Sequence, residues 1–125
     1  MDFENDVLAN TILIRRTLRS GQSVHYDGNV VVLGDVNPGA EIIASGNIIV
    51  MGALRGVAHA GAAGNVEAVV TAFRLQPSQL RIADQYTRAP DGVYPEPHIP
   101  ETARIKDGVV CIDGYQPAGE KQAVI

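Results

Sequence analysis

The chain contains Gly28-Asn29-Val30-Val31-Val32-Leu33 and repeats this pattern 18 residues later as Gly46-Asn47-Ile48-Ile49-Val50-Met51. Asn10-Thr11-Ile12-Leu13-Ile14-Arg15 fits one period earlier, and Gly64-Asn65-Val66-Glu67-Ala68-Val69 fits one period later. A shorter period of six lies within the longer one, and no α-helix or ordinary β-sandwich needs it. The positions that share this short period are apolar or small: Ile12, Leu18, Val24, Val30, Val36, Ile42, Ile48, Leu54, Ala60, Val66 and Ala72.

A glycine or alanine stands two residues before each of these positions from Val30 to Val66. Short strands separated by small corner residues at a fixed repeat length are typical of a parallel β-helix, in which each coil buries its apolar stripe only against a neighbouring coil. Six residues make one face and three faces close a coil. The sequence therefore predicts an all-β triangular prism of about four 18-residue coils, over residues 10–27, 28–45, 46–63 and 64–81.

The rest of the chain divides around this β-helix, which we place at residues 10–88. Four prolines fall between residues 89 and 100, so 89–103 is interpreted as a connector. Residues 104–115 contain an Asp-Gly pair between extended arms and predict a hairpin that covers the C-terminal end or one edge of the coils. Residues 116–125 are expected to be a tail, and 1–9 a linker or an artificial start.

Composition excludes several classes of function. The net charge is -4 with ten Lys plus Arg, so no basic stripe for nucleic acid is expected. Aliphatic residues dominate the 46% hydrophobic content and only 5% of residues are aromatic, which favours a narrow packed core over a pocket for a small-molecule substrate. One cysteine allows no internal disulfide, and neither a membrane-spanning run nor a signal peptide appears. A cytoplasmic protein is expected.

One outward face of the predicted prism is apolar. Strand alternation turns Val30 and Val32 inward and leaves Asn29, Val31 and Leu33 outside. A contiguous apolar patch on a β-helix marks an interface, and a second copy of the chain is the simplest partner, so we predict a homodimer. The alternative is that the C-terminal hairpin covers the patch. The predicted dimer residues are Leu13, Val31, Leu33, Ile49, Met51 and Val69.

The neighbouring outward face is polar and carries the motifs that identify a family. Leu18-Arg19-Ser20-Gly21-Gln22 is followed by Gly34-Asp35-Val36-Asn37-Pro38-Gly39-Ala40-Glu41-Ile42 and by Gly52-Ala53-Leu54-Arg55-Gly56. Over roughly residues 10–113 this order closely resembles the C-terminal domain of MinC, the septum-site-determining inhibitor of bacterial division. The resemblance implies a right-handed β-helix that dimerises through its hydrophobic face and binds the membrane-associated ATPase MinD through its RSGQ segment.

In that family the N-terminal domain acts on FtsZ, so the resemblance implies that this chain contacts FtsZ only through a domain that it lacks, and the membrane only through MinD. The residues to which the resemblance assigns MinD binding are Arg19, Ser20, Gly21, Gln22, Asp35, Asn37, Gly39 and Arg55. Arg19 is the strongest candidate, since a guanidinium on a flat face offers a planar fork of donors for carboxylates or carbonyls. For Gly21 and Gly39 a plain corner role stays open, and for Asp35 a plain ion pair with a neighbouring arginine.

Other chemistry is sparse. His25, His59 and His98 have no second ligand at a spacing that suits a metal, so neither a metal nor another cofactor is expected. No catalytic carboxylate pair is apparent, and we predict that the chain is not an enzyme. Asn29, Asn47 and Asn65 predict a stacked amide ladder. Two alternatives stay open: a hexapeptide-repeat acyltransferase, and a self-polymerising scaffold that resembles bactofilins.

Overall fold

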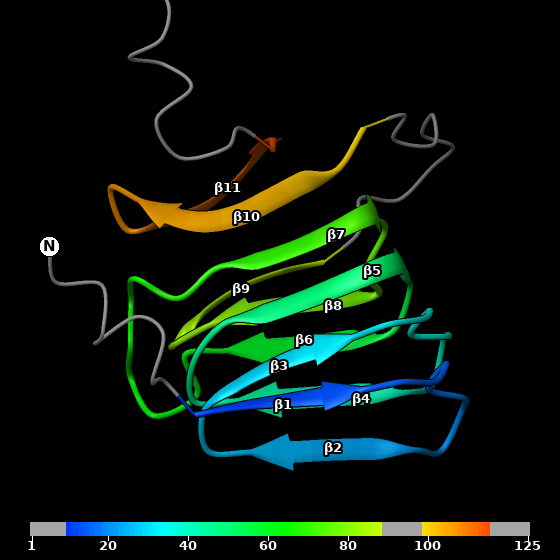
Figure 1. Ribbon diagram of the computed structural model, residues 1–125. Coiled ribbons are helices and arrows are strands. Elements are labelled where there is room, and N and C mark those ends of the chain that lie inside the picture. Colours follow the sequence, from blue (N-terminus) through cyan, green and yellow to red (C-terminus); the bar gives the residue numbers. More distant parts are fainter. Residues whose placement is uncertain (1–9, 89–98, 116–125) are drawn as a thin grey trace, which may run out of the picture.

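The computed structural model describes residues 10–88 and 99–115, which contain eleven strands and no helix (Figure 1). The strands are short because a small or polar corner residue ends each face after a few positions. Their bounds are β1 Thr11–Ile14, β2 Ser23–Tyr26, β3 Asn29–Val32, β4 Glu41–Ala44, β5 Ile48–Leu54, β6 Val57–Ala60, β7 Val70–Leu75, β8 Gln79–Ile82, β9 Gln85–Arg88, β10 Glu101–Lys106 and β11 Val109–Gly114.

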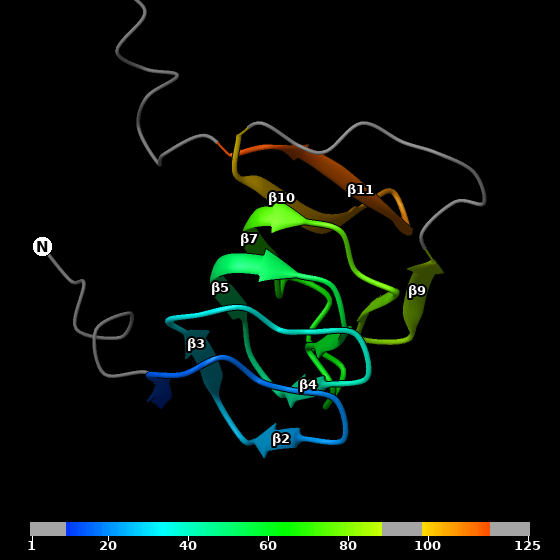
Figure 2. The same ribbon diagram turned by 90° about the vertical axis from the view of Figure 1, so that its right-hand side faces the viewer.

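The strands stack as the coils of a parallel β-helix, which confirms the predicted fold class. One wall is a sheet in the order β1-β3-β5-β7-β10-β11, and a second wall is a sheet in the order β2-β4-β6-β8-β9. The third wall is held by isolated parallel bridges from Leu18 to Val36 and from Val36 to Leu54, and by the ends of β5 and β7, where Leu54 pairs with Leu75. Figures 1 and 2 show that consecutive coils lie one above the next, so each apolar column along the chain becomes a continuous core.

Aliphatic side chains fill that core at every level. Each wall contributes one or two inward columns, and Val30, Val36 and Ile42 of the second coil are fully buried. Of their counterparts in the first coil, Leu18 is also fully buried, whereas Ile12 and Val24 are only partly buried. The inward positions predicted from the period of six are therefore correct through the third coil as far as Leu54.

The fourth coil departs from the predicted register. Ile48 pairs with Val70, whereas a repeat of 18 would place residue 66 there, and Val66 is 54% exposed. The change begins in the third coil, where Ile42 pairs with Ala58 and not with residue 60. Only Arg55 and Gly56 separate β5 from β6 at this corner, and Gly56 packs so closely on the backbone of Ala40 that a Cβ atom would overlap the carbonyl oxygen. Residues 61–69 then form a longer loop that restores the pairing.

The predicted asparagine ladder is confirmed for two of its three members. Asn29 Oδ1 accepts hydrogen bonds from the backbone N–H of Asn47 at 2.8 Å and from Asn47 Nδ2 at 3.1 Å. Asn47 Oδ1 in turn accepts from the backbone N–H of Val69 at 2.8 Å. Asn65 was expected as the third rung, but it lies in the loop, where its Oδ1 accepts from the N–H of Glu67. The amides of Asn29 and Asn47 therefore hold three coils in register.

Replacing Asn47 by Ala should destabilise the fold by about 1–3 kcal/mol, since it leaves the part-buried N–H of Val69 without its acceptor. Asn65→Ala is the matched control, because the hydrogen bond it removes is exposed. Urea unfolding measures both free energies. Equal losses for Asn47→Ala and Asn65→Ala would contradict a structural ladder.

The C-terminal hairpin caps the coil stack as predicted. β10 pairs antiparallel with β7 and with β11, and the Asp107-Gly108 turn has φ values of 53° and 78°, as a two-residue type I′ turn requires. β10 begins at Glu101, three residues before the predicted start at residue 104. The hairpin extends the first sheet at its edge (Figure 1), so it does not cover the outward apolar face. The predicted tail, 116–125, lies outside the described residues.

Candidate protein-binding faces

The corner that carries Arg19 is a tight turn in which two hydrogen bonds join its first and last residues, Arg19 and Gln22. The N–H of Gln22 donates to the carbonyl of Arg19 at 2.9 Å, and the N–H of Arg19 donates to Oε1 of Gln22 at 2.8 Å. Gly21 has φ of 86°, the conformation that the third position of a type II turn requires. The side chain of Gln22 therefore fixes the turn, while Arg19 and Ser20 stay exposed at its tip.

A second turn of the same kind stacks on the first, one coil further along. The N–H of Ala40 donates to the carbonyl of Asn37 at 3.0 Å, Pro38 occupies the second position, and Gly39 has φ of 88°. The N–H of Gly21 donates to the carbonyl of Gly39 at 2.9 Å and joins the two corners. The structure thus brings Arg19, Ser20, Gly21 and Gln22 together with Asn37 and Gly39, as the sequence predicted.

Gly39→Ala should destabilise the protein more than Gly21→Ala, although both glycines have nearly the same φ. A Cβ atom at Gly39 would overlap Oγ of Ser20, whereas nothing lies within 4 Å of a Cβ at Gly21. The left-handed backbone alone costs about 1–2 kcal/mol at either site, and the overlap adds to it at Gly39. Chemical unfolding of the two variants measures the difference, and equal losses would show that the Ser20 contact imposes no constraint.

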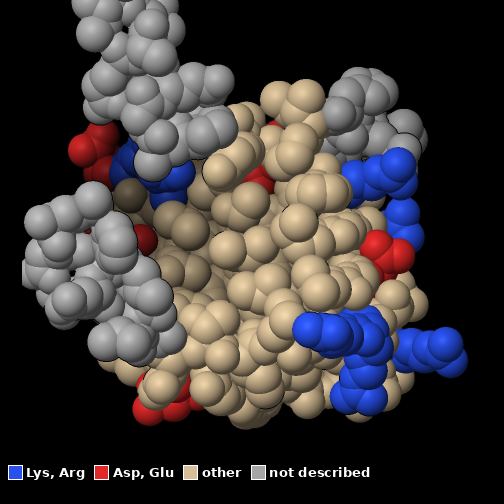
Figure 3. Space-filling view, viewed as in Figure 1, with Lys and Arg blue, Asp and Glu red and all other residues tan. Residues whose placement is uncertain are grey.

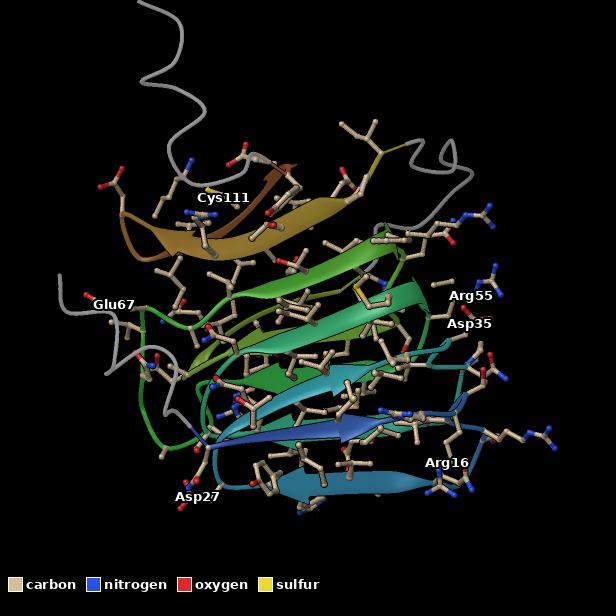
Figure 4. All side chains as sticks on the ribbon, viewed as in Figure 1. Arg16, Asp27, Asp35, Arg55, Glu67 and Cys111 are labelled. Atoms are coloured by element: carbon tan, nitrogen blue, oxygen red, sulfur yellow. The ribbon has the colours of Figure 1, made fainter. Side chains whose placement is uncertain are left out.

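Asp35 lies on the wall next to these corners and is bound by the backbone. Its Oδ1 accepts from the N–H of Ala53 at 2.8 Å, and its own N–H donates to Oγ1 of Thr17 at 3.2 Å. The two ion pairs found among the described residues do not include Asp35. Figure 4 shows Asp35 beside Arg55 at the edge where β5 ends. The carboxylate therefore links neighbouring coils and keeps one oxygen that these contacts do not use.

The electrostatics of this wall differ from those of the whole chain. Half of the ten Lys and Arg residues lie on it or at its border, although the net charge of the chain is -4. Figure 3 shows the positive side chains gathered along the edge where β1, β3 and β5 end, with few acidic atoms among them. We call this surface the arginine wall and define it by Arg15, Arg16, Arg19, Arg55 and Arg74.

Sequence reasoning missed Arg74. It lies opposite Ala53 because the pairing of β5 with β7 shifts between Val50 and Ala53. A constant repeat of 18 would have put residue 71 there. The available signal was the polar-apolar pair Arg74-Leu75, which resembles Asp35-Val36 on the same wall once the longer loop is allowed.

The outer surface of the first sheet is apolar, as predicted. Leu13, Leu33 and Met51 are between 43% and 47% exposed, and Val31 and Ile49 are half-buried beside them. In Figure 3 the front of the molecule over β1, β3, β5 and β7 shows a broad area without charged side chains. No described residue of the C-terminal hairpin lies across it. We call this surface the apolar wall.

The apolar wall differs from the prediction at its fourth rung. Val69 was expected to continue the column of Leu33 and Met51, but the register change places it at the position of Asn47, where its N–H completes the ladder. Phe73 continues the column instead and is 48% exposed. It was missed for the same reason as Arg74. The wall is consequently more apolar at its upper end than the sequence indicated.

The remaining outer surface carries two of the three histidines. Nε2 of His25 lies 3.6 Å from Oε1 of Glu41, and Nε2 of His59 is bonded to the carbonyl of Ala83 at 2.9 Å. Within residues 10–88 and 99–115 no three His, Cys, Asp or Glu side chains gather as a metal site would require. In the same residues no helix is long and apolar enough to cross a membrane. Away from these surfaces, burial raises the pKa of Glu101.

The fold and its two outer faces define the class of protein: a triangular parallel β-helix with an apolar wall beside an arginine-rich wall. Comparison with known proteins identifies the family within this class. A family model described as septum formation inhibitor MinC, C-terminal domain, matches residues 12–115. The chain therefore belongs to the MinC family and corresponds to its C-terminal domain.

Two relatives and one solved structure show the extent of the similarity. The probable septum site-determining protein MinC of Heliobacterium modesticaldum is 67% identical over 105 residues, which make up 84% of this chain and 36% of the relative. That of Clostridium novyi is 56% identical over 108 residues, or 86% and 50% of the two chains. The MinC:MinD cell division protein complex of Aquifex aeolicus matches with a TM-score of 0.81 and 37% identity, covering 91% of this chain and 93% of that chain. The chain thus spans between about a third and a half of these curated relatives.

Proposed function

We propose that this chain is the dimerisation and MinD-binding part of a MinC division inhibitor, which targets inhibition of FtsZ assembly to the wrong septum sites. The observation that carries this proposal is the pair of stacked turns that present Arg19 and Asn37 on the arginine wall. Their backbone is fixed by hydrogen bonds, so a partner meets preorganised side chains and loses little entropy in ordering them.

The similarity to a chain of the Aquifex aeolicus MinC:MinD complex supports MinD as the partner. Arg19 and Arg55 would bind carboxylates or carbonyls of MinD. Ser20 and Asn37 would add hydrogen bonds beside them, and Gly21 and Gly39 allow the backbone of the partner to approach closely. In this proposal Gln22 and Asp35 act mainly by holding these groups in place, because both use side-chain oxygens within the fold.

The apolar wall supports a homodimer. Burying about 800 Å² of each copy is typical of a stable interface, and apolar surface contributes roughly 25 cal/mol per Å². The central column of the apolar wall consists of Leu13, Val31 and Ile49, and Leu33, Met51 and Phe73 lie beside it. The two walls share an edge of the prism, so a dimer would leave both arginine walls available for MinD.

In this account the membrane is reached only through MinD. The chain would be cytoplasmic and recruited to the inner face of the cell membrane, and contact with FtsZ would belong to the N-terminal domain of a whole MinC. No nucleic acid, small-molecule substrate or cofactor takes part, and the chain itself catalyses no reaction.

Co-sedimentation with lipid vesicles tests this function. The chain should pellet with vesicles that carry MinD and ATP, and should stay in the supernatant with ADP or without MinD. Filaments that form without MinD and ATP would favour a self-polymerising scaffold instead. Recruitment that does not depend on MinD would contradict the proposal.

A further inference from the structure

Arg74 occupies a position on the arginine wall that the family motifs do not include. Hydrogen bonds join Thr17 to Asp35 and Asp35 to Ala53 across successive coils. The bulge in β5 sets Arg74 at the end of this column, directly opposite Ala53. Arg74 is exposed, and alanine beside it offers no bulk that would shield its guanidinium. The column therefore ends in a long cationic side chain one coil beyond Arg55.

Arg74 forms no ion pair with another described residue. Neither ion pair found in the described parts of the chain involves an arginine of this wall. The carboxylate of Asp35 already accepts from the N–H of Ala53. Arg55 lies diagonally from Arg74 on the neighbouring coil, because Arg74 stands opposite Ala53. Two cations at such a diagonal repel one another weakly, which slightly lowers the stability of the fold. Surfaces that retain such repulsion are typical of binding sites, where a partner of opposite charge relieves it.

The geometry points to Arg74 as a further contact residue, which extends the partner face over all four coils and binds carboxylates on an acidic protein surface. This inference rests on the proposed function and names the chemistry of the MinD surface that would cover the fourth coil. A planar guanidinium suits a carboxylate better than an ammonium does, since it donates two parallel hydrogen bonds. The contact lies at the rim of the site, so it should act mainly on the rate of association.

Association of the chain with immobilised ATP-bound MinD tests the contact. Arg74→Ala should weaken binding by about fivefold, mostly through slower association, and should make the rate less sensitive to added salt. Arg74→Lys should recover the salt dependence but only part of the affinity. Arg81→Ala is the control, because Arg81 lies on the opposite sheet and the carbonyl it contacts keeps its bond to His59. Arg74→Ala should unfold at a temperature no lower than the parent.

Two results would overturn the inference and leave the proposed function intact. One is unchanged MinD binding by Arg74→Ala in a preparation where Arg19→Ala weakens it. The other is a loss of MinD binding by Arg74→Ala that is no larger than the loss caused by Arg81→Ala, which would show that removing any exposed arginine has this effect. Unchanged MinD binding by Arg19→Ala as well would instead contradict the proposed function itself.

Discussion

Ile49→Asp should convert a dimer into a monomer of 13.3 kDa. Ile49 lies in the central column of the apolar wall, between Val31 and Thr71. A carboxylate there would be buried without a partner in the dimer, at a cost of several kcal/mol, whereas in the monomer it meets water. Sedimentation equilibrium of the parent and the variant measures the change.

Ile43→Asp is the matched control. Ile43 is also a half-buried isoleucine in the middle of a strand, but it lies on the outer surface of the second sheet, between His25 and His59. It should leave the size of the particle unchanged. A dimeric Ile49→Asp protein, or equal dissociation of both variants, would show that the apolar wall is not the interface.

Arg19→Ala should lower the affinity for MinD by about tenfold or more, enough to abolish binding at working concentrations. It should leave the unfolding temperature unchanged. The backbone of residue 19 makes the hydrogen bonds that close the turn, and the alanine variant keeps them. The exposed guanidinium is the group that changes. Titration with ATP-bound MinD gives the affinity, and circular dichroism gives the unfolding temperature.

Gln22→Ala should affect the stability of the fold more than the affinity for MinD. It removes the acceptor of the Arg19 N–H, so it should lower stability and weaken binding only through a looser turn. Unchanged affinity of Arg19→Ala would contradict the proposed site. A lower unfolding temperature for Arg19→Ala would mean that the loss of binding reflects the fold and not the contact.

Much of this fold follows from the sequence because a β-helix is nearly one-dimensional. Each coil contacts only its neighbours, so a period of six determines which side chains face inward. Val30, Val36 and Ile42 are fully buried as that period requires. The Asp-Gly turn of the C-terminal hairpin was also predictable, since a two-residue turn needs positive φ at both positions.

The fourth coil could not be predicted from the period alone. Gly64-Asn65-Val66 repeats the corner pattern, but the short corner at Gly56 and the loop at 61–69 shift the pairing by four residues. Corners tolerate insertions because they lie at the surface, and the buried columns decide where pairing resumes. Val70 and Ala72 are apolar and small enough to continue the core, so the loop presents Val66 to the solvent.

The candidate sites were predictable to different degrees. Alternation along the strands was sufficient to find the apolar wall, apart from its fourth rung, where Val69 was predicted and Phe73 is found. The corner at Arg19 was found through the resemblance to MinC, because no general rule of sequence assigns a partner to a serine and a glycine beside an arginine. Arg74 was missed since a constant repeat of 18 does not reach it, and its exact place depends on the bulge in β5.

Photo-crosslinking from one position on each wall tests whether two adjacent walls of the β-helix bind different partners. With benzoylphenylalanine at Asn37, Leu13 or Ile43 and with ATP-bound MinD present, we expect a MinD adduct from position 37, a dimer of the chain from position 13, and neither from position 43. MinD adducts from position 43 but not from position 37, or no dimer from position 13, would contradict the account.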